Sequence, residues 1–254
     1  METRLQVASE PRPKVAVISH ERSGTHFLMN TLAANLGYVA RPWWNFDFEL
    51  GLNFHAPQGL RDYFRQVRGH AVLNILKSHH QAAFFEPFVA EFLEEFRILY
   101  IVREPLAVMA SFWRLVQSLP WDEGPRTESP AAFMRAAPRG ALLRYQKAQV
   151  PTMLERWAVH VEGWLDLAAR HPEGIVVVRY EQLDGRFGET VGMLAGRLGL
   201  APPPAPVRPS REVNVVRDTV GHARTPPYTD EDRDWAAGRV AATLRRIAAL
   251  APAA

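Results

Sequence analysis

The sequence contains no cysteine, so it offers no disulfide framework, no thiolate nucleophile and no cysteine-based zinc site. It also lacks any run of about 18 consecutive apolar residues, and its charged N-terminal segment has no apolar core of a signal peptide. Neither a membrane span nor a secretory signal is therefore expected, and we predict a cytoplasmic protein.

An excess of charge of one sign is also nearly absent. The 30 Lys and Arg residues against 27 Asp and Glu residues leave a net charge of +3. A nucleic-acid-binding protein usually concentrates its excess in a basic run or stripe, and the sequence shows none. We therefore expect no nucleic-acid partner, and a basic RNA-binding protein is the weakest alternative.

The amino acids that are present are those of an ordinary globular protein. Hydrophobic residues make up 47% and charged residues 22% of the 254 positions, which supplies enough apolar surface for a sizeable core. We see no internal repeat. The prediction is a single domain spanning residues 1–254.

Short apolar runs of strand length alternate with segments of helical period. Strands are predicted at residues 15–19, 71–76, 97–102 and 175–178. Helices are predicted at residues 27–36, 105–118, 153–168, 189–198 and 230–250. Near-continuous apolar strands separated by helices predict an α/β fold with a central parallel sheet flanked by helices.

Two segments show no such period. Residues 41–60 mix aromatic side chains with Asn, Gly and Pro, and we assign no regular element to them. Residues 119–140 are rich in Pro, Gly, Ser and charge, which predicts a mobile surface segment or lid.

Polar residues follow each predicted strand, and parallel sheets bind their ligands beyond the carboxyl ends of the strands. The residues at these ends are Arg22 and Ser23, Lys77 and His79, Arg103, and Tyr180. Such a convergent set of cations, one candidate base and one aromatic ring indicates an anionic ligand.

The loop HERSGTH, residues 20–26, resembles a phosphate-binding loop, in which a glycine lets backbone N–H groups curl around an anion. It is not a Walker A loop, because the G-x-x-x-x-G-K-[ST] spacing is absent and no lysine precedes Ser23. The loop alone also fits an ordinary turn in which Ser23 or Thr25 caps the helix and Arg22 is solvated.

Four segments together carry a resemblance to a known family. RSGTHFL after VAVIS, KSH after VLNIL, YIVREPLAVMASFW, and IVVVRYEQL occur in the order seen in PAPS-dependent sulfotransferases. The resemblance spans residues 15–183. It implies a three-layer, P-loop-like fold with a five-stranded parallel sheet, related to nucleotide kinases. The implied activity is transfer of a sulfuryl group from 3′-phosphoadenosine-5′-phosphosulfate (PAPS), which leaves adenosine 3′,5′-bisphosphate (PAP), with no metal required.

The resemblance also implies roles for individual residues. The general base is His79, Lys77 contacts the bridging oxygen and the leaving phosphate, and Arg103 and Ser111 bind the 3′-phosphate. The implied catalytic residues are His79, Lys77 and Arg22. The implied cofactor-binding residues are Arg22, Ser23, Gly24, Thr25, His26, Phe27, Arg103, Ser111, Tyr180 and Arg217.

The chain departs from the family pattern at several positions. Arg22 stands where many relatives have lysine, His26 where they have a second threonine, and Phe27 where many have a stacking tryptophan. The C-terminal signature R-K-G-x-x-G-x-W is absent, and only Arg217 is carried over from the loosely similar RDTVGHART. The usual dimerisation motif is not found, which leaves a homodimer open.

Other interpretations stay open at this point. Arg103 alone fits a strand-end salt bridge with Glu104 or Glu181, and His79 with His80 suggests a metal pair, although no second ligand set with metal spacing accompanies them. We interpret Trp157 and Trp164 as packing residues and leave His160 beside them unassigned.

At the level of function, the predicted acceptor is a hydroxyl of a small-molecule or lipid-like compound, in a pocket shaped by residues 43–54 and 119–140. The alternatives are a P-loop-type nucleotide or small-molecule kinase, which would need a Walker lysine, and a catalytically silent nucleotide-binding module.

Overall fold

The computed structural model of the chain describes residues 12–40, 44–45, 57–68, 74–210 and 228–250. Within these ranges, none of the helices combines the length and the hydropathy needed to cross a membrane. Arg217 and almost all of the predicted pocket segment 43–54 lie outside the described residues.

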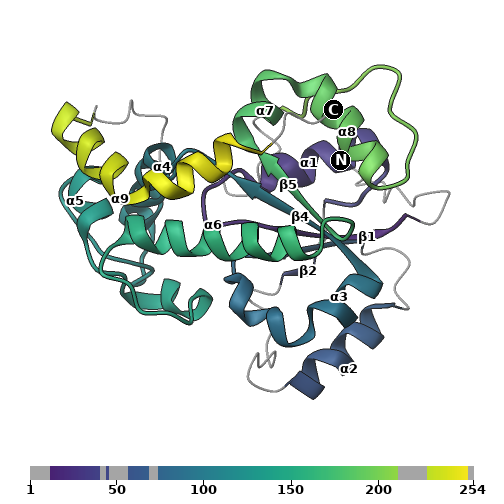
Figure 1. Cartoon of the computed structure of the whole chain (residues 1–254), viewed down its shortest axis with the longest axis horizontal. Coiled ribbons are helices and arrows are strands. Elements are labelled where there is room, and N and C mark those ends of the chain that lie inside the picture. Colours follow the sequence, from purple (N-terminus) through teal and green to yellow (C-terminus); the bar gives the residue numbers. More distant parts are fainter. Residues whose placement is uncertain (1–11, 41–43, 46–56, 69–73, 211–227, 251–254) are drawn as a thin grey trace.

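A parallel sheet of five strands forms the centre of the structure, in the order β2-β3-β1-β4-β5 (Figure 1). The strands are β1 (Lys14–Ile18), β2 (Trp44–Asn45), β3 (Ile75–Ser78), β4 (Phe96–Val102) and β5 (Ile175–Arg179). The last residue of β1, Ile18, is in register with Ser78 of β3 and Tyr100 of β4. The loops that follow the strands therefore meet at one edge of the sheet.

Helices cover both faces of this sheet, which confirms the predicted three-layer α/β fold (Figure 1). They are α1 (Thr25–Leu36), α2 (Pro57–Arg68), α3 (Val89–Glu95), α4 (Pro105–Ser118), α5 (Pro130–Arg135), α6 (Met153–Arg170), α7 (Tyr180–Gly185), α8 (Phe187–Arg197) and α9 (Asp230–Ala248). Short 3-10 helices lie at Ala82–Phe84, Glu86–Phe88 and Gly140–Tyr145.

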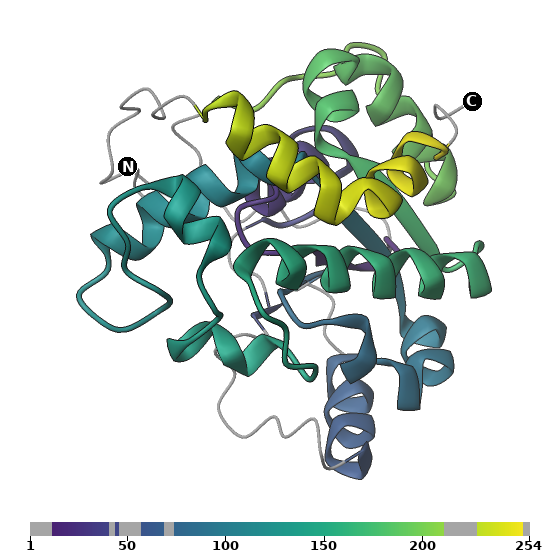
Figure 2. The ribbon, with the colours of Figure 1, turned by 60° about the vertical axis from the view of Figure 1, so that its left-hand side comes forward.

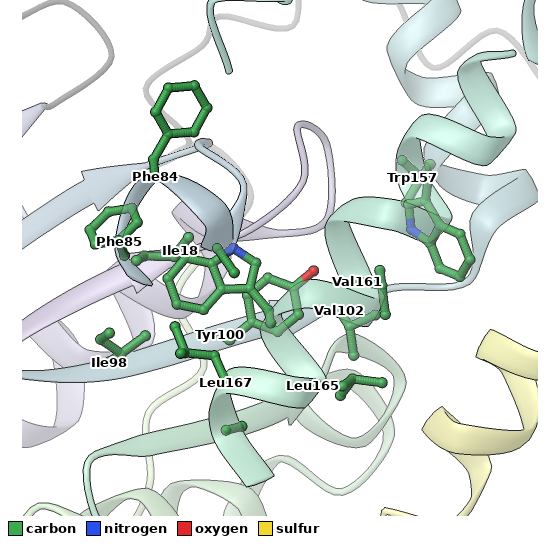
Figure 3. Packing of buried hydrophobic residues seen from close by; sticks show 14 of the residues in the cluster. Ile18, Phe84, Phe85, Ile98, Tyr100, Val102, Trp157, Val161, Leu165 and Leu167 are labelled. Carbon is green, nitrogen blue, oxygen red and sulfur yellow. The ribbon is translucent and has the colours of Figure 1, made fainter. Parts of the chain in front are cut away.

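Alternating side chains of the strands divide the core into two layers, because successive residues of a strand point to opposite faces. Val15 and Val17 pack with α1 and α8, whereas Ala16 and Ile18 face the layer that contains α4 and α6. In that second layer, Tyr100 lies among apolar side chains of the sheet and α6 (Figure 3). Helix α9 packs on the outer side of α6 (Figure 2).

The ends of the helices follow local capping rules. Glu104 accepts hydrogen bonds from the N–H groups of Leu106 and Ala107, and Pro105 takes the first position of α4, where no donor is needed. Thr152 caps α6, and Gly37 ends α1 in the left-handed conformation. These caps fix where each helix begins relative to the strand edge.

Two predictions about elements are wrong. Strand β3 ends at Ser78 rather than at residue 76, so Lys77 lies inside the strand. Its pairing with Val17 of β1 and Asn45 of β2 continues the strand beyond the apolar run. The segment 41–60, to which no regular element was assigned, contains strand β2 and the start of α2. Strand β2 is stabilised by pairing with β3, although the sequence shows no clear period there.

The segment 119–140, predicted as a mobile surface segment or lid, contains α5 at residues 130–135, and Phe133 and Met134 of this helix are buried.

Candidate functional site

The loop between β1 and α1, residues 19–24, has the backbone of an anion-binding turn. Arg22 and Gly24 both adopt positive φ, 67° and 100°. A Cβ added at Gly24 would lie 2.5 Å from Cδ2 of Tyr180, so only glycine fits this close approach.

Helix α1 begins at Thr25 without a side-chain cap. The hydroxyl of Thr25 instead hydrogen-bonds to that of Ser19 at 2.6 Å. The alternative in which Ser23 or Thr25 caps the helix is therefore wrong.

Ser23 is the strongest indication of a ligand in this loop. Its hydroxyl is fully buried and has no hydrogen-bond partner among the described residues. A buried hydroxyl left unsatisfied costs ~1–3 kcal/mol. A phosphate or sulfate oxygen would satisfy it, and the N-terminus of the 12-residue helix α1 favours negative charge at the same place. The loop thus fits an anionic group.

Ser111 of α4 and Arg103 after β4 come together with Arg22 of the loop. Nε of Arg22 donates to the hydroxyl of Ser111 on α4 at 3.0 Å. Nη1 of Arg103, directly after β4, reaches the carbonyl oxygen of Arg22 at 3.4 Å, and its guanidinium lies 4.3 Å from the ring centre of Tyr180. The structure therefore brings together Arg22, Ser111, Arg103 and Tyr180, four of the residues that the sequence predicted for the cofactor site.

Glu104 and Glu181, the alternative partners of Arg103, are engaged elsewhere. Glu104 caps α4, and the carboxylate of Glu181 accepts from the N–H of Glu104 at 2.9 Å. The described residues contain no ion pair between Arg103 and either carboxylate, so the strand-end salt bridge is wrong.

His79 lies on the other side of the loop, immediately after β3. Its Nδ1 is 2.9 Å from the carbonyl oxygen of Ser19. A carbonyl oxygen can only accept, so Nδ1 carries the proton and Nε2 carries the lone pair. This tautomer suits a group that takes a proton at Nε2.

Lys77 precedes His79 by two residues and is buried in β3, opposite Val17 of β1. The next histidine, His80, has its Nδ1 2.9 Å from the hydroxyl of Ser78. In the described part of the chain, no group of three or more metal-ligating side chains could hold a metal ion.

Aromatic side chains form a third part of the site. The ring centre of Phe27 lies 5.9 Å from that of Tyr180 and 6.2 Å from that of Phe187. The guanidinium of Arg208 lies 5.2 Å from the ring centre of Phe27 and donates to the carbonyl of Asp184 at 2.7 Å. Arg208 was not among the predicted site residues, because nothing in the proline-rich run before it signals this position.

His26 is half-buried in the first turn of α1, and Arg217 lies outside the described residues. The roles implied for these two residues remain predictions.

A buried polar cluster behind the loop was also missed. Arg156 of α6 donates to both carboxylate oxygens of Glu21, at 2.7 and 2.8 Å, and to Nε2 of His20 at 2.8 Å. Burial alone raises the pKa of Glu21, but the charge and hydrogen bonds of Arg156, together with the neighbouring His20 and His79, outweigh it and hold that pKa well below its ordinary value. Burial lowers the pKa of His20 to about 4. The sequence signal for this buried cluster was Arg156, an arginine among the apolar positions of α6.

Comparisons with known proteins identify the family and the fold. The model of the sulfotransferase domain family matches residues 12–214. The sulfotransferase domain of the Synechococcus PCC 7002 olefin synthase superposes with a TM-score of 0.54 at 18% identity, covering 94% of this chain and 98% of that one. The sulfotransferase domain from the curacin biosynthetic pathway gives 0.51 at 15% identity, covering 91% and 99%.

A mouse sulfotransferase complexed with PAP has a TM-score of 0.51 and 16% identity, and the match covers 97% of this chain and 69% of that one. No curated protein matches the sequence. At these identities the solved structures show a shared fold, whereas the family match extends over most of the chain. The chain therefore belongs to the sulfotransferase family, as the order of its four strand-end motifs predicted.

Proposed function

We propose that this sulfotransferase moves a sulfuryl group from PAPS to a hydroxyl of a small-molecule or lipid-like acceptor and releases PAP. The observation that carries the proposal is the buried Ser23 hydroxyl, which lacks a partner among the described residues, in a loop that contains Arg22 and contacts His79. The mouse sulfotransferase of the same fold was solved with PAP, which supports this choice of nucleotide.

The donor would be held at two anionic ends. The loop from Arg22 to Thr25, with His26 beside it, would take the 5′-phosphate end, where backbone N–H groups and the helix N-terminus favour negative charge. Arg103 and Ser111 would take the 3′-phosphate, because a guanidinium offers a planar fork to phosphate oxygens. Arg217 is proposed as a further contact.

The adenine would lie against the aromatic side chains of Phe27 and Tyr180. Both rings are half-buried, so each keeps part of its surface outside the core. Stacking on such a ring orients a flat base without consuming its hydrogen-bonding edge.

When bound, PAPS supplies a sulfuryl group whose bond to the 5′-phosphate oxygen breaks as a bond to the acceptor oxygen forms. His79 takes the acceptor hydroxyl proton at Nε2, since its Nδ1 proton is held by the carbonyl of Ser19. A positioned general base of this kind contributes ~10²–10⁴-fold in rate.

Lys77 and Arg22 would neutralise the charge that develops on the leaving phosphate. Lys77 is buried in β3 two residues before His79, and a fixed cation acts more strongly where water is excluded. Like phosphoryl transfer, sulfuryl transfer mainly requires the protein to position the reactants and to neutralise the charge that develops.

The nucleotide preference tests the proposal directly. PAP at a hundredfold excess over its dissociation constant stabilises the folded state by ~2.7 kcal/mol, and we expect ATP with magnesium to give much less at the same concentration. Thermal unfolding with each nucleotide measures this difference. Equal shifts, or no shift with PAP, would contradict the proposal.

Catalysis is tested separately with His79→Ala. This variant should lose sulfuryl transfer, followed with radiolabelled PAPS and a panel of alcohols, while keeping the stabilisation by PAP. His171→Ala, at the end of α6, is the matched control and should keep full activity. Full activity of His79→Ala would show that another group takes the proton, and loss of PAP binding in that variant would show that His79 belongs to the nucleotide site.

A further inference from the structure

Helix α6 presents three polar groups toward the loops of the active-site edge. Arg156, His160 and Trp164 recur every four residues, so they lie on one face of the helix. Each contacts a segment that follows a strand. Arg156 binds Glu21 after β1, Nε2 of His160 lies 3.1 Å from the carbonyl of His79, and Nε1 of Trp164 donates to the carbonyl of His80 at 3.1 Å.

The hydrogen-bond directions around His160 are determined by its partners. The carbonyl of His79 only accepts, so Nε2 of His160 carries the proton. Nδ1 is then an acceptor, and the hydroxyl of Tyr100 donates to it at 3.0 Å. A chain of hydrogen bonds therefore runs from the Tyr100 hydroxyl through the imidazole of His160 to the backbone carbonyl of His79, and each of these groups is neutral.

The surroundings hold this chain in one arrangement. His160 is almost fully buried, and burial keeps its pKa well below the ordinary value. Burial likewise raises the pKa of Tyr100, so its hydroxyl stays protonated. The ring of Tyr100 stacks on those of His160 and Trp164, with centres 5.7 and 5.6 Å apart.

His79 is thereby held from both sides. Its ring is fixed by the carbonyl of Ser19, which begins the anion-binding loop, and its main chain is fixed by His160. The distance between the base and the loop depends on these two bonds. A misplacement of about 1 Å at a reacting group can lower the rate ~10²-fold.

We propose that His160 is a positioning residue that places His79 against the anion-binding loop by donating a hydrogen bond to its carbonyl oxygen. This inference rests on the proposed function, in which His79 takes the acceptor proton. His160 itself does not touch the reacting atoms and does not hold the nucleotide.

The test compares three variants in the full chain. His160→Leu removes the donor, and we expect kcat to fall about 10- to 100-fold while KM for PAPS and the thermal shift with PAP stay within about twofold of the parent. His160→Gln keeps an N–H donor of similar reach and should recover most of the lost kcat.

Tyr100→Phe removes only the hydrogen bond that selects the tautomer, and a loss of about fivefold is expected. Val159→Ala, at the exposed neighbouring position of α6, is the control and should leave kcat unchanged.

A double-mutant cycle with His79→Ala separates positioning from general destabilisation. If His160 acts through His79, then His160→Leu has no further effect on the residual rate of His79→Ala. Parent-like kcat in a folded His160→Leu, or equal losses in the Leu and Gln variants, would overturn the inference. The inference would also be overturned if His160→Leu lowered the residual rate of His79→Ala by the full factor that it causes in the parent.

The two proposals fail in different ways. An inactive His79→Ala with an active His160→Leu overturns only the positioning role. An active His79→Ala overturns the proposed base, and with it the basis of the positioning role. If His160→Leu does not fold, His160→Gln and Tyr100→Phe test the positioning role instead. The proposal is contradicted if His160→Gln loses as much kcat as Tyr100→Phe, or more.

Discussion

Glu21 and Arg156 form a buried bidentate ion pair that joins the anion-binding loop to α6, with nitrogen–oxygen distances of 2.7 and 2.8 Å. The remaining donors of Arg156 reach Nε2 of His20, the side-chain oxygen of Gln146 and the carbonyl of Leu142. Because the charges are paired and hydrogen-bonded, neither is left isolated in the core.

Removing one partner of this pair should destabilise the protein strongly. In Arg156→Met the carboxylate of Glu21 stays buried without its cation, and breaking such a pair costs ~3–5 kcal/mol. Urea unfolding at pH 7 measures the loss. Arg239→Met breaks an exposed pair with Glu155 and should cost below ~1 kcal/mol. Similar losses in the two variants would mean that the buried pair has no special weight.

Stability should fall as the pH is lowered from 6.5 to 4. In the folded state the pKa of His20 is about 4, against an ordinary value of 6.5, so only the unfolded state takes up a proton in this window. Across the window this one group contributes a loss of about 3 kcal/mol. Burial lowers the pKa of His160 in the same direction, which adds to the slope.

Urea unfolding at several pH values measures this slope. His20→Gln should flatten it, whereas His171→Gln at the end of α6 should leave it as in the parent. An unchanged slope in His20→Gln would refute the assignment to His20. Below the ordinary glutamate pKa of 4.5, Glu21 should add a further loss, because the unfolded state then takes up a proton while the depressed pKa keeps the folded carboxylate ionised.

Gly24→Ala should weaken both the fold and nucleotide binding. The new Cβ would stand 2.5 Å from Cδ2 of Tyr180, at a φ of 100° that L residues rarely adopt. Such strain costs ~1–3 kcal/mol, and displacement of the Tyr180 ring should raise the dissociation constant of PAP. Gly196→Ala in α8 meets no atom within 4 Å and should instead stabilise by ~0.5–1 kcal/mol. Unfolding curves with and without PAP check both variants.

Arg103→Lys should impair PAP binding although the charge is kept. Lysine has no planar fork for a phosphate and no flat face to lie over Tyr180. Loss of a charge-assisted hydrogen bond corresponds to an increase of about tenfold or more in the dissociation constant, measured by calorimetry. Arg97→Lys, at an exposed position of β4, is the control. Parent-like affinity of Arg103→Lys would place the 3′-phosphate elsewhere.

Much of this site could be predicted from the sequence because its parts are local. The apolar run before residue 19, the glycine at residue 24 and the proline at residue 105 each act on the backbone within a few residues of themselves. A parallel sheet then brings the strand ends to one edge whatever the details of packing. The cations at the strand ends and His79 were therefore found without coordinates.

Contacts between distant segments could not be predicted from the sequence. The bond between Arg22 and Ser111 spans 89 positions, and that between Arg156 and Glu21 spans 135. A helical pattern shows which face of α6 is buried, but it does not show which loop that face meets. His160 was consequently left without a role.

The sequence by itself determined the alternation of the main strands and helices along the chain and the residue types at the carboxyl ends of the strands, because local periodicity and backbone preferences specify them. Only the tertiary structure decided the proton positions on His79 and His160 and left Ser23 buried without a partner among the described residues. Those properties depend on which carbonyls and hydroxyls lie within about 3 Å, and hydrogen bonds at that range are set by packing.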